Sequence, residues 1–115
     1  NSDGGHLLFR PIGLLAIVDV VRRLIDDGDN LDLAVSKVAA VPMDLGSAPW
    51  VDLLWDPINK RMITSTDNQH ADKKVLYFAA GGNLENMRSS ENSLKRELSG
   101  LLKRDESNIE LRRYV

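Results

Sequence analysis

Cysteine is absent from the 115-residue sequence, aromatic residues are few, and no long apolar run occurs. Without cysteine the chain forms neither a disulfide nor a thiolate metal site, which fits a cytoplasmic protein. The most apolar stretch, IGLLAIVDVV, is interrupted by Asp19 and is shorter than the roughly 20 residues that a membrane-spanning helix needs. We therefore expect cytoplasmic localisation and no membrane partner.

Motifs for catalysis and for cofactor binding are missing as well. The two histidines, His6 and His70, stand in no metal-binding spacing, and no serine occupies a G-x-S-x-G turn. The pair Gly81-Gly82 follows a predicted helix, whereas phosphate-binding loops precede one, so we interpret it as a helix C-cap. We expect no enzyme, no catalytic residue, no metal and no cofactor.

Apolar residues recur at three-to-four spacing in four segments, which is typical of amphipathic helices. Pro11 suits the first turn of the first helix, and Gly28 suits its C-terminal end. The predicted buried stripes of the first two helices are Leu14, Ile17, Val18, Val21, Leu24 and Ile25, and then Leu31, Ala34, Val35 and Val38. Because Ala16 and Val20 widen the first stripe, we expect the first helix to be central in the fold.

These patterns predict a mainly α fold, with four or five short helices in a compact bundle. Residues 53–63 are compatible with one small β-hairpin or with a short turn between two helices. Asp56-Pro57 favours a turn there, and Asn59 tolerates left-handed backbone geometry.

The chain is predicted to be a single helical domain over residues 1–115. We expect a lead-in over 1–10, the main helical core over 11–80, a connector over 81–92, and a C-terminal helix and tail over 93–115. Since the apolar helical pattern starts almost at once, without an initiator Met, we expect the chain to be a fragment of a longer protein.

Charge is unevenly distributed along the chain. Residues 19–56 contain eight acids and three bases, whereas residues 57–115 contain eleven bases and eight acids. Such a polarised chain could join an acidic surface to a basic one, within the longer protein or between copies in a homo-oligomer. The alternative is that these charges belong to solvated helix faces.

Six dibasic pairs hold twelve of the fifteen basic residues. DNA binding requires such residues to gather on one face, because neutralisation of phosphates drives it. The pairs are instead scattered over four predicted elements and interleaved with acids. We therefore expect no sequence-specific DNA binding by this chain alone, and DNA contact only through the full-length protein.

Two segments, GGHLLFRPIGLLAIVDVV and PWVDLLWDPINKRMI, resemble the C-terminal part of DGQHR-domain proteins, the group of DndB-like proteins associated with DNA sulfur modification. The matching positions are Phe9, Arg10, Pro11, Gly13, Trp50, Trp55, Asp56, Pro57 and Met62. The resemblance covers residues 4–82. The DGQHR motif itself is absent, which implies that the N-terminal domain of the family lies outside this chain.

The resemblance implies a non-enzymatic helical module linked to control of DNA phosphorothioation or to phage defence. Such a module would pack on the N-terminal domain of its parent chain or associate with itself. A DNA-contacting transcriptional-regulator domain is the alternative. The candidate interface or structural residues are Phe9, Arg10, Pro11, Trp50, Trp55, Asp56 and Met62.

Two of these expectations leave alternatives open. Because a proline follows it, Arg10 is expected to have extended backbone geometry. Its side chain either binds a carboxylate, such as that of Asp56, or lies on the surface. At least one of Trp50 and Trp55 is predicted to be buried against the first helix. The competing interpretation is an exposed aromatic pair on which nucleic-acid bases stack.

Overall fold

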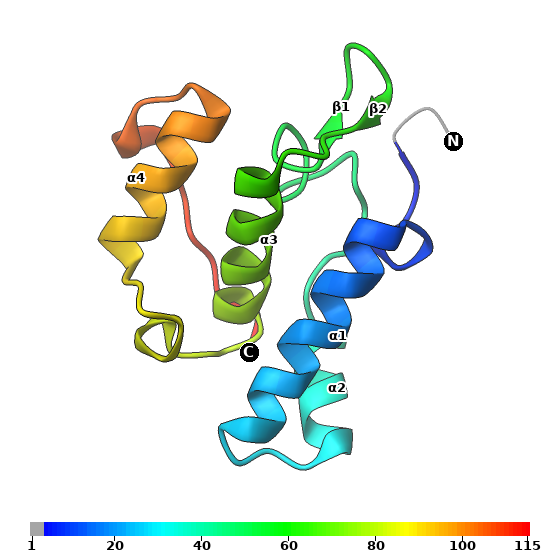
Figure 1. The fold of residues 1–115 in the computed structure, drawn as a ribbon, viewed down its shortest axis with the longest axis vertical. Coiled ribbons are helices and arrows are strands. Elements are labelled where there is room, and N and C mark those ends of the chain that lie inside the picture. The colour runs from blue at the N-terminus through cyan, green and yellow to red at the C-terminus, as the bar shows by residue number, and fades with distance from the viewer. Residues whose placement is uncertain (1–3) are drawn as a thin grey trace.

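The chain folds as helices arranged around one central helix, with a small hairpin at one end. The computed structural model describes residues 4–115, and in that part of the chain it has four α-helices and one two-stranded antiparallel hairpin (Figure 1). The helices are α1 (Pro11–Asp26), α2 (Leu31–Ala39), α3 (Thr66–Ala79) and α4 (Glu91–Leu102), and the strands are β1 (Trp55–Asp56) and β2 (Arg61–Met62). The mainly α fold is confirmed, and of the two alternatives for residues 53–63 the hairpin forms.

Local sequence signals determine where α1 and α2 begin and end. Pro11 occupies the first position of α1, and the preceding Arg10 is extended, as a residue before proline is expected to be. Gly28 has a φ of 117°, which glycine adopts without strain, and there the chain turns away from α1. The side chain of Asn30 accepts a hydrogen bond from the Leu33 N–H at 2.8 Å and begins α2. Because this connection is short, α2 folds back beside α1.

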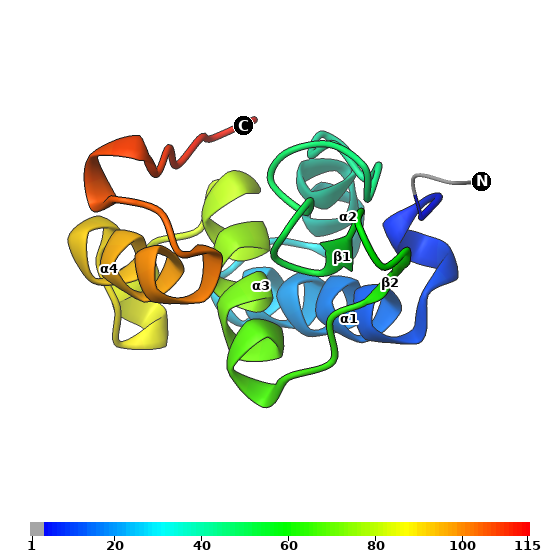
Figure 2. The same ribbon diagram turned by 90° about the horizontal axis from the view of Figure 1, so that it is seen from above.

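The central helix is α3, which lies between α1 and α4 (Figures 1 and 2). Its C-terminal half is buried from Val75 to Ala79. The prediction that α1 is central is wrong, because α1 packs along one side only and its other side faces solvent. The apolar content of a helix does not reveal whether both of its apolar sides find a partner.

Between α2 and the hairpin, residues 41–54 form irregular turns that supply part of the core. Trp50 is fully buried, and its indole N–H donates to the Pro42 carbonyl at 2.7 Å. Leu53 is buried as well, and its carbonyl accepts a hydrogen bond from the Asn68 side chain of α3 at 2.8 Å. These bonds hold the irregular segment against the central helix.

The C-terminal part differs slightly from the expected boundaries. The Ser90 side chain accepts a hydrogen bond from the Ser93 N–H at 3.1 Å, so α4 begins at Glu91, inside the expected connector. After α4 a short 3-10 helix leads into an extended tail. In that tail the Tyr114 N–H donates to the Ala79 carbonyl at 2.8 Å. The tail thereby satisfies one of the carbonyls that the end of α3 would otherwise leave without a partner.

Replacing Trp50 with alanine should lower the free energy of unfolding by about 3–5 kcal/mol, because a large void opens and the Pro42 carbonyl loses its donor. Urea unfolding followed by circular dichroism measures this loss. Phe9→Ala is the matched control, since Phe9 is 80% exposed and its removal should change the free energy by less than about 0.5 kcal/mol. Equal effects of the two substitutions would contradict the burial of Trp50.

Candidate interaction surface

The two segments that carry the family resemblance meet at Arg10 and Trp55. The Arg10 guanidinium donates to the Gly4 carbonyl from Nε at 3.1 Å and from Nη2 at 2.9 Å. Its Cζ atom lies 5.4 Å from the centre of the Trp55 ring, within the range of a cation–π contact. A Cβ atom on Gly4 would lie 2.6 Å from the same ring, so only glycine fits there. This Arg10–Trp55 cluster therefore holds the segment before α1 against the hairpin.

The carboxylate of Asp56 is used inside the hairpin turn. It accepts hydrogen bonds from the backbone N–H groups of Ile58 and Asn59 at 3.0 and 3.1 Å, and from the Asn59 side chain at 2.7 Å. The bond from the Asn59 side chain is the main reason that the pKa of Asp56 is lowered. Neither alternative for Arg10 is found, because the half-buried Arg10 binds a carbonyl while Asp56 holds the turn.

The remaining candidate residues are partly buried and partly exposed. Trp50 and Trp55 are both buried, which confirms the predicted burial of at least one tryptophan, while its packing against α1 stays a prediction. Base stacking needs an exposed ring face, so it does not fit these two residues. Met62 is half-buried opposite Trp55, whereas Pro11 and Phe9 are exposed. The structure thus joins Met62 to Trp55 and leaves Phe9 at the surface.

Helix α1 buries only one edge of its predicted apolar face, where Ala16 and Val20, which were expected to widen that face, are fully buried. Its buried residues are Gly13, Ala16, Val20 and Leu24. Of the predicted stripe, Leu24 is buried, Ile17 and Val21 are half-buried, and Leu14, Val18 and Ile25 are exposed. A Cβ atom on Gly13 would lie 2.1 Å from the Leu7 carbonyl oxygen, which shows how closely Leu7 packs against the helix there. In the N-terminal half of α1, the small residues Gly13 and Ala16 therefore face inward, while Leu14 and Leu15 face the solvent.

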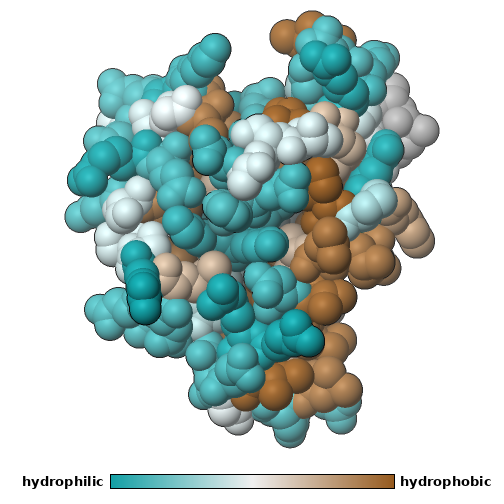
Figure 3. Space-filling view, viewed as in Figure 1, coloured by the Kyte–Doolittle hydropathy of each residue, from teal (hydrophilic) through white to brown (hydrophobic). Residues whose placement is uncertain are grey.

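The exposed apolar residues of α1 continue onto α2 as one surface. In α2, Ala34 and Val38 are buried, while Leu31 and Val35, which were predicted to be buried, are exposed. Figure 3 shows a band of apolar side chains along the edge of the molecule formed by α1 and α2. We define the apolar face by its exposed residues Leu8, Phe9, Leu14, Leu15, Val18, Ile25, Leu31 and Val35. Because large contiguous apolar patches mark interaction sites, this face is the best candidate for one.

Other features of the fold are weaker candidates. A groove of about 230 Å³ lies between α3, α4, the tail and the irregular segment, with Val75 and Phe78 among its lining residues. Arg104, a cation that also lines it, already pairs with Asp52 at 2.7 Å. Within residues 4–115, no three histidines or acids are placed to hold a metal ion. No helix in the described part of the chain has the length and apolar character needed to cross a membrane.

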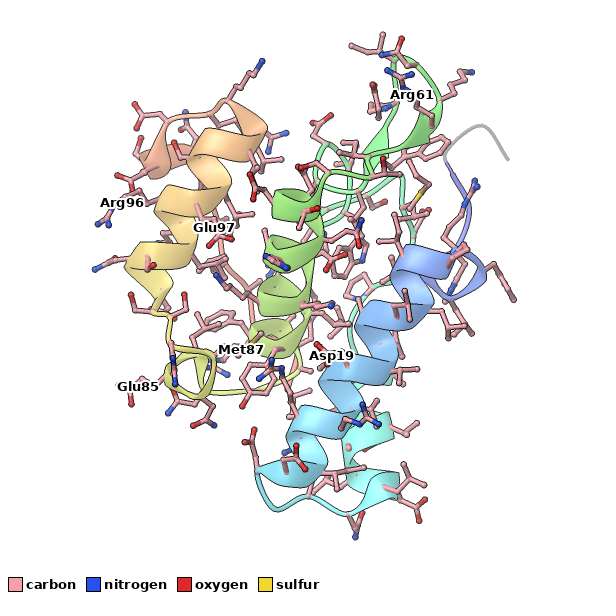
Figure 4. The ribbon with its side chains drawn as sticks, viewed as in Figure 1. Asp19, Arg61, Glu85, Met87, Arg96 and Glu97 are labelled. Carbon is pink, nitrogen blue, oxygen red and sulfur yellow. The ribbon has the colours of Figure 1, made fainter. Side chains whose placement is uncertain are left out.

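Asp72 is a buried carboxylate that no motif in the sequence marks. The residue is 1% exposed, and neither carboxylate oxygen has a hydrogen-bond partner among the residues that the structure describes. Burial raises the pKa of Asp72 to about 7; Asp19 adds to the increase, and Lys73 opposes it. Asp19 projects from α1 toward α3 (Figure 4), where it pairs with Lys73 at 3.9 Å. Asp72 is therefore protonated in the folded protein at mildly acidic pH.

Two valines, two positions apart on α1, test which side of the helix is buried. At a protein concentration that keeps the chain monomeric, Val18→Lys should change the free energy of unfolding by less than about 0.5 kcal/mol, because Val18 is 52% exposed. Val20→Lys places an ammonium group in the core, where Val20 is fully buried, and should unfold the domain. Circular dichroism and urea unfolding distinguish the two outcomes. If Val18→Lys unfolds the protein, α1 buries the stripe that its periodicity predicts.

Asp72 should make the protein less stable as the pH rises. Its folded-state pKa of about 7 exceeds the ordinary value of 3.8, so the folded state binds the proton more tightly than the unfolded state. Its contribution is fully present below about pH 4 and is lost between about pH 4 and 7. Asp72→Asn should therefore match the parent protein at about pH 4 and exceed its stability by about 4 kcal/mol at about pH 8. In urea unfolding across this range, a difference that is independent of pH would contradict the raised pKa.

Comparison of the chain with protein-family models, with curated proteins and with solved structures finds no match in any of the three. Function is therefore inferred from the residues and contacts of this chain. Among its features, the apolar face on α1 and α2 most clearly requires a partner. Of the cations that line the groove, Arg104 is already paired, and Asp72 is enclosed by the core.

Proposed function

We propose that this chain is a non-enzymatic helical docking module of a DGQHR-type, DndB-like protein, linked to control of DNA phosphorothioation or to phage defence. It works by covering its apolar face with another protein surface, either the N-terminal domain of its parent chain or a second copy. The apolar face itself carries this proposal, with Leu15 at 62% and Val18 at 52% exposure. Removing such surface from water favours association.

The Arg10–Trp55 cluster supports the DGQHR part of the proposal. Arg10 belongs to the first segment that resembles the family, and Trp55 and Met62 belong to the second. The fold brings these segments together through the guanidinium, the indole ring and the backbone of Gly4. Residues that contact one another in the fold are a better basis for a family resemblance than scattered positions.

Ion pairs favour protein docking over the DNA-contacting alternative. Several members of the dibasic pairs are engaged by acids: Lys73 with Asp19 at 3.9 Å, Lys74 with Glu97 at 2.8 Å, Arg96 with Glu106 at 3.6 Å and Arg104 with Asp52 at 2.7 Å. Each of these acids partly neutralises its base and would repel a nearby phosphate. DNA binding depends on cations gathered on one face to neutralise phosphates. Contact with DNA is therefore assigned to the longer protein rather than to this module.

A photo-crosslinking residue at Val18 tests the proposal in cells that make the protein. p-Benzoylphenylalanine at this position should crosslink to peptides of a DGQHR domain or of a second copy, identified by mass spectrometry. The same residue at Glu85 is the control, because Glu85 is exposed and lies away from the apolar face (Figure 4). No crosslink from Val18, or equal crosslinks from both positions, would rule out docking through this face.

A further inference from the structure

The exposed side of α1 has the residue spacing of a seam between paired helices. Leu14, Val18, Val21 and Ile25 follow one another at intervals of four, three and four residues. This is the spacing of the core positions of a two-stranded coiled coil, in which β-branched residues such as Val18 and Ile25 alternate with positions that favour leucine, such as Leu14. Three of the four residues are exposed, and Val21 is half-buried at the edge of the seam. The surface that fits this seam is another helix lying along α1.

Charges of opposite sign flank the two ends of the apolar face. The N-terminal end of α1 is preceded by Arg10, and the hairpin lies at the same end of the helix (Figures 1 and 4). Its turn holds Lys60 and its strand β2 begins at Arg61, and both residues are exposed. At the C-terminal end, Asp26, Asp27 and Asp32 are exposed and outnumber the exposed Arg22 of α1. The face therefore runs from a basic end to an acidic end, and a complementary partner must present these charges in the reverse order.

We propose that the occupant of the apolar face is the same face of a second copy, paired antiparallel about a two-fold axis. This inference rests on the proposed docking function and names its partner. The antiparallel order places the basic end of each copy beside the acidic end of the other, and it also sets the two α1 dipoles favourably. A parallel order would bring like charges together. Leu14 of one copy then lies opposite Ile25 of the other, and Val18 lies opposite Val21.

The two-fold relation also covers the parts of the face that lie outside the seam. Leu8 and Phe9, at the basic end, meet Leu31 and Val35 at the acidic end of the other copy. Because the contact is isologous, each of these pairings occurs twice in the dimer. One antiparallel arrangement therefore accounts for the exposed apolar residues on both α1 and α2.

Sedimentation velocity over a range of protein concentrations tests for the second copy. We expect the chain to sediment as a dimer and Val18→Lys to weaken the association at least about a hundredfold, because it buries an ammonium group in the seam. Glu85→Lys is the matched control and should leave association unchanged. Circular dichroism confirms that both variants are folded.

A chain that stays monomeric at every soluble concentration overturns this inference. If Val18 then crosslinks to a DGQHR domain in cells, the proposed docking function still stands. If no crosslink forms, both the inference and the proposed function fail. A dimer that Val18→Lys does not weaken would place the contact elsewhere on the surface and would also overturn the inference.

Because the chain has no natural cysteine, the order of the two copies can be tested separately. Leu14→Cys mixed with Ile25→Cys should form a disulfide between the two chains under mild oxidation. Leu14→Cys alone should not, since antiparallel copies separate their two position-14 residues by about 16 Å along the helix axis, beyond the reach of a disulfide. A disulfide formed efficiently by Leu14→Cys alone would show a parallel order and overturn the antiparallel pairing.

Discussion

Close contact between α1 and the residues that precede it governs which side of this helix faces the solvent. A Cβ atom on Gly13 would lie 2.1 Å from the Leu7 carbonyl oxygen, so a larger residue does not fit on that side. Ala16 and Val20 continue the same side and are fully buried. Once one side of a helix is fixed, its 3.6-residue period fixes the direction of every other side chain, and Val18 must point outward. The apolar face is thus the counterpart of tight packing on the opposite side of α1.

Three consecutive charged residues of α3 affect how this helix packs against its neighbours. Lys73 pairs with Asp19 of α1 at 3.9 Å, and Lys74 pairs with Glu97 of α4 at 2.8 Å. Such partly exposed pairs contribute little individually. Asp72 is different, because an ionised carboxylate that is buried without a partner opposes folding. Burial is the main reason that the pKa of Asp72 is raised, and Asp19 of α1 adds to it, so the packing around α3 favours the protonated carboxyl.

The sequence predicts structure well where a local signal begins an element. Pro11 and Asp56 stand at the start of α1 and of the hairpin turn, and the structure confirms both of them. The buried side of α1 is not predictable in this way, because apolar residues occupy both sides of the helix. Their periodicity indicates a helix but does not tell which side packs against the core. The burial of Asp72 depends on how distant segments pack against α3. The hydrogen-bond partner of Arg10 is a backbone carbonyl. Pairing oppositely charged residues in the sequence does not identify such a partner.

The Arg10–Trp55 cluster gives the residues of the family resemblance a role in orienting the docking surface. The hydrogen bonds of Arg10 and its contact with Trp55 attach the segment before α1 to β1. The hairpin, which carries Lys60 and Arg61, is thereby held at one position relative to α1. Loss of the cluster would leave the apolar side chains on α1 but release the basic end of the face. The cluster therefore contributes to recognition without contacting the partner, because it holds in place the charges that determine the orientation of the partner.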